Sequence, residues 1–454
     1  MKNRNIPVIV GLIAILFFTA CQEEFLDLKS DKKLVVPTTL KDFRALMDNS
    51  DIMNNSSVPY LGEVSADDYY MSTENFMSIS GSTVLHNSYI WASDIYGGEH
   101  QLNDDWARLY QMVLYCNVVL EGLEKLPHNA LSGEWKEIKG TAYFFRSWAF
   151  YQLAQLFCVQ YDAVTASEDI GIPIRLHADI KVKASRNTVA ETYRQIISDL
   201  SNAVKLLPPH TLFKTRPGGD AAYAMLAKVY LQMGDYEAAL DNAGESLSIY
   251  DGLLDFNSID TALAYPFEMF NKEVIFHAVM RTNSIFRRRL NVDTSLYRLY
   301  AENDIRKQAF FQQGEEGITY KGSYNGDYKF FGGISVAEVY LIKAECNARL
   351  NKTGEALMDL QQLWRNRVSN YHDPLEIDQD SMLNIVLEER RKELVFRGIR
   401  WADLRRLNKE PRFSKTLIRK VDGKEYRLLP NDPKYVFPIP PTSVSISGLE
   451  QNPR

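Results

Sequence analysis

Apolar residues recur at a helical spacing over residues 220–250, and one turn divides this stretch into two. One face of the first predicted helix carries large and small side chains in a regular order, namely Tyr223, Leu226, Ala227 and Tyr230. Asp220 is expected to cap the start of this helix. Gly234 would end it, because glycine adopts the left-handed C-terminal conformation at little cost, and Asp235 would cap the helix that follows. The pattern predicts two helices joined by a tight turn.

This order of large and small residues is similar to the tetratricopeptide repeat of about 34 residues. One such unit cannot bury its own apolar face, so neighbouring units are expected. Residues 337–367 keep the same order and form a second candidate unit. A third candidate is split, with a helix over 135–157 paired with a helix over 189–207 and residues 161–188 inserted between them. The alternative for each unit is ordinary helical core that matches the repeat by chance.

Three other stretches also have an interpretable pattern. A helix is expected over residues 102–126, and one long helix over residues 381–407. In the long helix two glutamates each precede a base by four residues, Glu388 with Lys392 and Glu393 with Arg397. This charged face is therefore expected to be solvated and self-paired. Residues 430–441 contain several prolines and are expected to lie extended across the body.

Two long stretches, residues 48–100 and 251–331, interrupt the helical period. Long irregular segments in a compact protein are usually functional. Aromatic rings suit the apolar side of sugar rings, and fixed polar groups suit their hydroxyls. Because no helical period buries the loop aromatics, we expect a nutrient site between these two stretches, away from the repeats. The candidate ligand-binding residues are Asp67, Asp68, Tyr70, Trp91, Tyr96, Tyr297, Tyr320 and Tyr324.

Residues 1–20 have the pattern of a secretion signal. Lys2 and Arg4 precede an apolar run over 6–18, which is shorter than the roughly 20 residues that a membrane-spanning helix needs. Small residues directly before the lone Cys21 are similar to a bacterial lipobox. Cys21 is therefore expected to be the lipidated N-terminus, followed by a tether over 21–34 and one helical domain over 35–454.

Composition narrows the class of protein. Hydrophobic residues make up 45% and charged residues 24% of the chain, which is typical of a soluble globular domain. The net charge of −6 argues against nucleic acid as a partner. Cys116, Cys158 and Cys346 each lie in an apolar helical pattern, so burial is expected rather than a disulfide framework or a zinc site.

The sequence contains no strong signature of catalysis. Metal-ligand histidine spacing, a nucleophile elbow and a phosphate-binding glycine loop are all missing from it, so no metal and no cofactor are expected. The acid pairs Asp67/Asp68 and Asp104/Asp105 leave a glycoside hydrolase open, since that chemistry needs two carboxyls at a set separation. A structural adaptor that binds only proteins is a further alternative.

Taken together, the chain resembles the SusD/RagB family of Bacteroidetes surface lipoproteins. The residues that carry the resemblance are Cys21, the helices over 140–157 and 336–350, the pair over 186–208, the charged segment 388–405, and the tail with Phe437, Pro438, Ile439, Pro440 and Asn452. The resemblance implies a mostly α tetratricopeptide-like scaffold with loop-rich insertions and little β structure. It also implies a surface protein that captures oligosaccharides or other nutrients for a SusC-like TonB-dependent transporter in the outer membrane. Only the lipidation of Cys21 transfers residue by residue.

Overall fold

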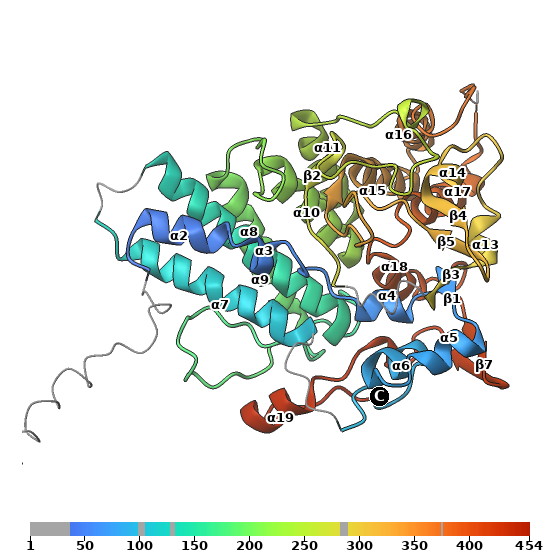
Figure 1. The fold of residues 1–454 in the computed structure, drawn as a ribbon. Helices are drawn as coiled ribbons and strands as arrows, with labels where there is room; N and C mark the ends of the chain where they lie inside the picture. The colour runs from blue at the N-terminus through green and yellow to red at the C-terminus, as the bar shows by residue number, and fades with distance from the viewer. Residues whose placement is uncertain (1–36, 99–104, 128–131, 282–288, 374–375) are drawn as a thin grey trace, which may run out of the picture. The chain divides into compact units, whose positions relative to one another are not determined.

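Successive helices pack against one another to form the scaffold in the computed structural model, which describes residues 37–98, 105–127, 132–281, 289–373 and 376–454 (Figure 1). The main scaffold helices are α7 (Asp105–Glu124), α8 (Gly133–Phe157), α9 (Val189–Leu206), α10 (Gly219–Met233), α11 (Tyr236–Ile249), α15 (Val336–Arg349), α16 (Thr353–Trp364), α17 (Gln379–Glu393) and α18 (Arg400–Leu407). Within residues 40–454, α10 packs on α9 and α11, and α15 packs on α11, α16 and α17. The expected mostly α, tetratricopeptide-like class is confirmed.

The first repeat unit forms as its sequence predicts, apart from its first cap. Gly234 ends α10 with a φ of 78°, and the Asp235 side chain accepts a hydrogen bond from the Ala238 amide at the start of α11. Asp220 does not cap α10, so that expectation is wrong. The helix already begins at Gly219, and the Asp220 carboxylate instead pairs with His210.

The split unit also forms as predicted, with α8 packed along α9. Thr188 and Glu191 make a reciprocal capping box at the start of α9. Aromatic residues of α8 extend the core beyond the repeats, because Phe144 and Trp148 pack edge-on against Phe276 with ring centroids 4.9 and 5.2 Å apart. The chain between α8 and α9 is the inserted segment that the sequence indicates.

The single long helix expected over residues 381–407 is wrong. The chain forms α17 and α18 with a break between them, where Phe396 has a φ of 57° and Gly398 a φ of 75°. A left-handed conformation at both positions ends the helical path. The chain therefore changes direction between α17 and α18 instead of continuing as one helix.

The predicted self-pairing of this helix's charged face is also wrong, although Glu388 is exposed as expected. Glu393 is buried and pairs with Arg306 and Arg367 rather than with Arg397. Lys392 pairs with Asp304 and with Glu389 instead of Glu388. These charged side chains therefore bind α17 to residues 251–331, because buried carboxylates need cationic partners.

The two interrupting stretches contain short elements rather than irregular chain alone. Residues 48–98 include α3 (Ser50–Met53), α4 (Leu61–Ser65), β1 (Tyr69–Tyr70), α5 (Thr73–Ser78) and α6 (Thr83–Tyr89). Residues 251–331 include η2 (Phe256–Ser258), β2 (Val274–Phe276), β3 (Asn291–Val292), α13 (Thr294–Tyr297), α14 (Arg306–Phe310), β4 (Phe311–Gln313) and β5 (Ile318–Tyr320). We call them the first and second insertions.

Strands contribute only small two-stranded antiparallel pairs within the described residues. The pairs are β1 with β3, β2 with β6 (Ile334–Ser335), β4 with β5, and β7 (Leu417–Val421) with β8 (Lys424–Leu428). The remaining elements are α2 (Leu40–Met47), η3 (Pro433–Tyr435) and α19 (Pro441–Ser447). After η3 the tail is extended, and the Phe437 amide donates to the Leu156 carbonyl at 2.8 Å, which fastens the tail to the end of α8.

The three predicted core cysteines are buried, as expected. Burial raises the pKa of the Cys158 thiol to about 12, so this side chain behaves as a small neutral hydrophobe. The expected signal segment and Cys21 lie outside the described residues. Within the described part of the chain, no helix is both long enough and apolar enough to cross a membrane.

Candidate functional site

The first and second insertions meet along strands β1 and β3. Tyr69 pairs with Val292 and Tyr70 with Asn291, and the Asp293 amide extends the pairing by donating to the Asp68 carbonyl at 2.9 Å. Residues from both insertions surround the exposed end of this pair. We call this surface the seam and define it by Tyr70, Ser72, Asn75, Arg289, Asn291, Glu316 and Gly317.

Polar side chains of the seam are held in place by one another. The Ser72 hydroxyl and the Asn75 amide both donate to Glu316 Oε2, at 2.9 and 2.6 Å. Arg289 Nη1 donates to Asn75 Oδ1 at 3.1 Å. This chain of hydrogen bonds joins the two insertions and holds the exposed Glu316 carboxylate and the partly exposed Arg289 guanidinium around the buried Asn75 amide. Preorganised groups of this kind bind a polar ligand at a lower entropic cost.

Tyr70 supplies the accessible aromatic ring of the seam, since 38% of its surface is exposed. Its hydroxyl lies close to Gly317, where an added Cβ would be 3.2 Å from that oxygen and 2.9 Å from Asn291 Oδ1. Glycine therefore permits the close approach of the β5 side of the second insertion to the ring. An exposed ring beside fixed polar groups matches what a sugar ring offers, namely an apolar face and hydroxyl edges.

Asp67 and Asp68 lie behind the seam, where cations occupy both carboxylates. Asp67 accepts from Arg400 at 2.6 Å and from Lys415 at 2.7 Å, and Asp68 accepts from Arg391 at 3.1 Å. Burial raises the pKa of Asp67, but Arg400 and Arg391 outweigh it and hold that pKa well below its usual range. At Asp68 burial prevails over the same arginines and raises the pKa. These carboxylates fasten the first insertion to α17 and α18.

Trp91 and Tyr96 belong to the core. The expectation that these loop aromatics stay unburied because they lack a helical period is therefore wrong. Each is only 2% exposed. Trp91 Nε1 donates to the Ser65 carbonyl at 3.0 Å, and the Tyr96 hydroxyl donates to the Pro438 carbonyl at 3.1 Å. The rings pack the inside of the first insertion, because a loop segment without a helical stripe still has to bury apolar area.

The three candidate tyrosines of the second insertion are also partly or fully buried. Tyr320 and Tyr324 are 6% and 1% exposed, so they too belong to the core rather than to an open platform. Tyr320 packs on Phe396 with ring centroids 4.7 Å apart. The Arg397 guanidinium lies 4.1 Å from the centre of the Tyr324 ring. Tyr297 is half-buried and lies edge-on to Phe311, at the rim of the insertion.

Of the eight candidate residues, Tyr70 provides the exposed ring. Asp67 and Asp68 lie behind it and are paired with cations. The sequence reasoning did not select the polar seam residues Ser72, Asn75, Arg289 and Glu316. They carry no spacing signal, because their partners are more than two hundred residues apart along the chain. Contact between the insertions is what makes them one surface.

Solved structures with the same fold cover nearly the whole chain. A SusD superfamily protein from Bacteroides thetaiotaomicron has a TM-score of 0.72 at 20% identity and covers 92% of this chain and 100% of its own. A surface glycan-binding protein A from Bacteroides uniformis has a TM-score of 0.69 at 17% identity and covers 91% of this chain and 99% of its own. These likenesses establish the fold.

Sequence comparisons agree with the structural ones. The SusD-like protein P2 of Formosa agariphila is 22% identical over an alignment of 375 residues, and the match covers 66% of this chain and 71% of that protein. One family model, described as starch-binding and associating with the outer membrane, matches residues 24–231, and the model described as the SusD family matches residues 333–454. The two matches together take in most of the scaffold and the tail, and over these residues the chain is similar to proteins of the SusD family.

Proposed function

We propose that this protein binds glycans at the seam without catalysis and delivers them to a SusC-like TonB-dependent transporter in the outer membrane. The family description and the naming of one structural relative as a glycan-binding protein support the ligand class. The single observation that carries the site is the exposed Tyr70 ring set beside the hydrogen-bonded group of Ser72, Asn75, Arg289 and Glu316.

The chemistry of the seam fits the capture of a sugar chain. The ring offers an apolar face for stacking, and Glu316 and Arg289 offer an acceptor and donors for sugar hydroxyls. Because these groups lie on an open surface rather than in a closed cavity, a long glycan could lie across the seam. Capture and release for transport need moderate affinity, which a single stacking ring with a few hydrogen bonds provides.

Glycan hydrolysis is disfavoured by the state of the acidic residues that the sequence offered for it. Asp67 and Asp68 are paired with arginine and lysine, as described above. Asp105 is buried, and its Oδ2 accepts from the Tyr60 and Leu61 amides at the start of α4. Asp104 lies outside the described residues, and the three described carboxylates of these pairs are each held by cations or backbone amides. An assay of reducing ends with the purified domain should therefore detect no turnover of any glycan that it binds.

Binding at the seam is tested by calorimetry with glycans selected on an array, with maltohexaose included because of the family description. Tyr70→Ala should weaken binding about tenfold or more, since aromatic stacking on nucleic-acid bases, taken as an analogy, is worth about 1–3 kcal/mol. Phe213→Ala is the matched control, because Phe213 is an exposed ring that lies between α9 and α10, outside both insertions. Unchanged affinity in a folded Tyr70→Ala protein would move the site away from the seam.

Attachment to the membrane is proposed to depend on the lipidated Cys21. The motivating feature is the short apolar run that ends in a lipobox-like sequence. Cys21→Ala should move the protein from the membrane fraction to the soluble fraction of fractionated cells. Membrane association that persists after the signal has been processed in this variant would contradict the proposal.

A further inference from the structure

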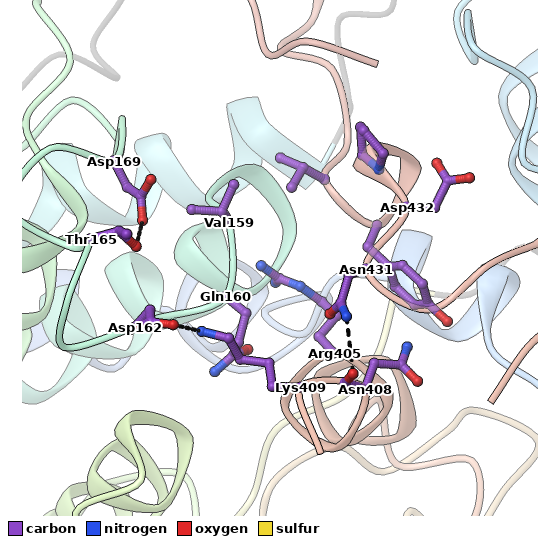
Figure 2. A pocket seen from close by; sticks show the side chains of 13 residues that line it. Val159, Gln160, Asp162, Thr165, Asp169, Arg405, Asn408, Lys409, Asn431 and Asp432 are labelled. Atoms are coloured by element: carbon purple, nitrogen blue, oxygen red, sulfur yellow. Dashed lines mark hydrogen bonds and ion pairs between the residues drawn. The ribbon is translucent and has the colours of Figure 1, made fainter. Parts of the chain in front are cut away.

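A cleft of about 320 Å³ lies between the end of α18, the tail around η3 and the loop that follows α8 (Figure 2). In Figure 2, Asp162, Thr165 and Asp169 come from the loop on one side, and Asn408, Asn431 and Asp432 come from the α18 end and the tail on the other. We call it the α18 cleft. Its volume is at the lower end of the range of roughly 300–1,000 Å³ that small-molecule sites occupy.

A second depression of about 360 Å³ adjoins the α18 cleft and shares Gln160, Asp162 and Lys409 with it. It extends between the turn from α10 to α11, where Gln232 lies, and the ends of α15 and α18. The ion pair of Lys409 and Asp162 forms the boundary between the two hollows. Together they make one groove with two compartments.

Charged side chains in this groove are largely satisfied by the protein itself. Arg405 donates to the backbone carbonyls of Gln155 and Cys158, and Lys409 is paired with Asp162. Asp169 accepts from the Thr165 hydroxyl at 2.6 Å. No group of His, Cys, Asp or Glu side chains suited to a metal ion exists among the residues that the structure describes. An ionic ligand or a metal therefore finds little uncompensated charge here.

Neutral polar atoms in the groove are less well satisfied. Gln160 Nε2 donates to the Gln232 carbonyl at 2.7 Å, but the side-chain Oε1 atoms of both glutamines are buried without a hydrogen-bond partner in the described chain. Asn408 Nδ2 and the Tyr435 hydroxyl are buried in the α18 cleft, where the Asn408 side chain is the hydrogen-bonding neighbour of the Tyr435 hydroxyl. Buried polar atoms without a partner are costly, so an incoming partner for them is favourable.

We infer that this groove is a second binding site, separate from the seam, for a neutral hydroxyl-rich molecule such as a mono- or disaccharide. A sugar hydroxyl both donates and accepts, so one kind of group can serve the acceptors Gln160 and Gln232 and the donor Asn408. A charged ligand would have to compete with ion pairs that already exist. The ligand class rests on the proposed function, whereas the location rests on the groove alone.

Two substitutions remove buried polar atoms, one substitution in each compartment. Gln232→Met removes the unsatisfied Oε1 together with Nε2 at nearly constant side-chain length, and Tyr435→Phe removes only the hydroxyl. Because Gln232 Oε1 has no partner to lose, Gln232→Met should leave thermal stability nearly unchanged, whereas Tyr435→Phe loses the contact with Asn408 and should lower stability slightly. Tyr300→Phe is the matched control, since the Tyr300 hydroxyl donates to the Lys392 carbonyl at 2.8 Å. The control should lower stability and leave binding intact.

Saturation-transfer NMR with the full mature chain tests the site, with maltose as the neutral probe and glucuronate and glucosamine as charged counterparts. In a Tyr70→Ala background, which removes the seam ring, maltose should still give a signal and the charged probes much less. Adding Gln232→Met or Tyr435→Phe should then weaken maltose binding about fivefold or more.

The outcomes separate the two sites. Loss of all maltose signal in Tyr70→Ala alone, with Gln232→Met and Tyr435→Phe indistinguishable from wild type, would overturn the groove and leave the seam standing. Loss only in the groove variants would confirm the groove and remove the seam as the carbohydrate site. Equal binding of glucuronate and maltose in the groove would overturn the neutral ligand class.

Discussion

Helical periodicity suggests that aromatic rings of the repeat scaffold are buried and that those of the insertions are exposed. For several rings the structure shows the reverse. Tyr223 and Tyr230, which lie on a regular helical face of α10, are only partly buried. Trp91, Tyr96 and Tyr324, which come from segments with no period, are almost fully buried. Periodicity thus identifies helices, but the absence of periodicity does not identify surface.

The insertions compensate for irregular backbone with polar atoms on their large rings. A segment that lacks regular structure leaves carbonyl groups that need donors. Trp91 and Tyr96 bury their rings and donate to the carbonyls of Ser65 and Pro438, so one side chain contributes both apolar area and a hydrogen bond. In the scaffold the helices satisfy their own carbonyls, and small residues such as Ala239 suffice for close packing.

The largest effect is expected at the charges that join the second insertion to the scaffold. Arg367 is fully buried and pairs with Glu273 of the insertion and Glu393 of α17. Arg367→Ala would leave two buried carboxylates without this partner and should lower the free energy of unfolding by roughly 3–5 kcal/mol. Arg365→Ala is the control, since its pair with Asp373 is solvent-exposed and is expected to contribute little to stability. Urea denaturation of both variants would decide, and equal effects would contradict the view that this network is essential.

A comparison of two tryptophans asks whether the insertion core is as strong as the scaffold core. Trp91→Ala should cost roughly 3–4 kcal/mol of unfolding free energy, close to the cost of Trp148→Ala in α8, because both rings are buried and both donate to a backbone carbonyl. Thermal denaturation of the two variants tests this. A Trp91→Ala protein as stable as wild type would mean that the first insertion opens without affecting the scaffold.

Two buried carboxylates should give opposite dependence on pH. Burial, together with the Asp68 charge, raises the pKa of Glu63 in α4 from 4.5 to about 8. Glu345 in α15 is also buried, but Arg406 and Arg349 outweigh that burial and lower its pKa. The folded protein therefore holds a proton on Glu63 between pH 4.5 and 8 that the unfolded chain releases, so this group makes stability fall as pH rises through that window.

Glu63→Gln keeps an acceptor for the Gly398 amide, which donates to Glu63 at 3.0 Å, and removes the titration. Relative to wild type it should gain stability as pH rises from 5 to 9, by roughly 2–4 kcal/mol across the range. Glu345→Gln should instead lose stability relative to wild type at neutral pH and approach it as pH falls below 4.5, where the paired carboxylate no longer contributes. Parallel pH curves for Glu63→Gln and wild type would show that Glu63 is ionised in the fold.

Local features of this protein were predictable from sequence, whereas contacts between distant segments were not. The turn at Gly234 and Asp235 depends on a few neighbouring residues, so its caps were foreseen correctly. The break between α17 and α18 depends on Phe396 adopting a positive φ, which a bulky residue does only when its surroundings require it. No local pattern signals that requirement.

The seam shows the same limit at the candidate site. Placing the site between the two insertions required only the observation that both lack a helical period. Selecting its residues required the contact of Ser72 with Glu316, which are 244 positions apart. The acidic pair Asp67 and Asp68 was found for its charge, but its pairing with Arg391 and Arg400 depends on how the first insertion folds against the scaffold.

The smallest expected effect compares a glycine in the turn of the first repeat unit with a glycine inside a helix of the second unit. Gly234 adopts a left-handed conformation at the end of α10, so Gly234→Ala should cost about 1 kcal/mol of unfolding free energy. Gly354 lies in the first turn of α16, has no positive φ, and an added Cβ would meet nothing within 4 Å. Gly354→Ala should therefore stabilise the protein by roughly 0.4–1 kcal/mol, because alanine restricts the unfolded chain and favours the helix. Thermal unfolding of the two single variants should shift in opposite directions, and a shift in the same direction would contradict the difference in backbone conformation between the two positions.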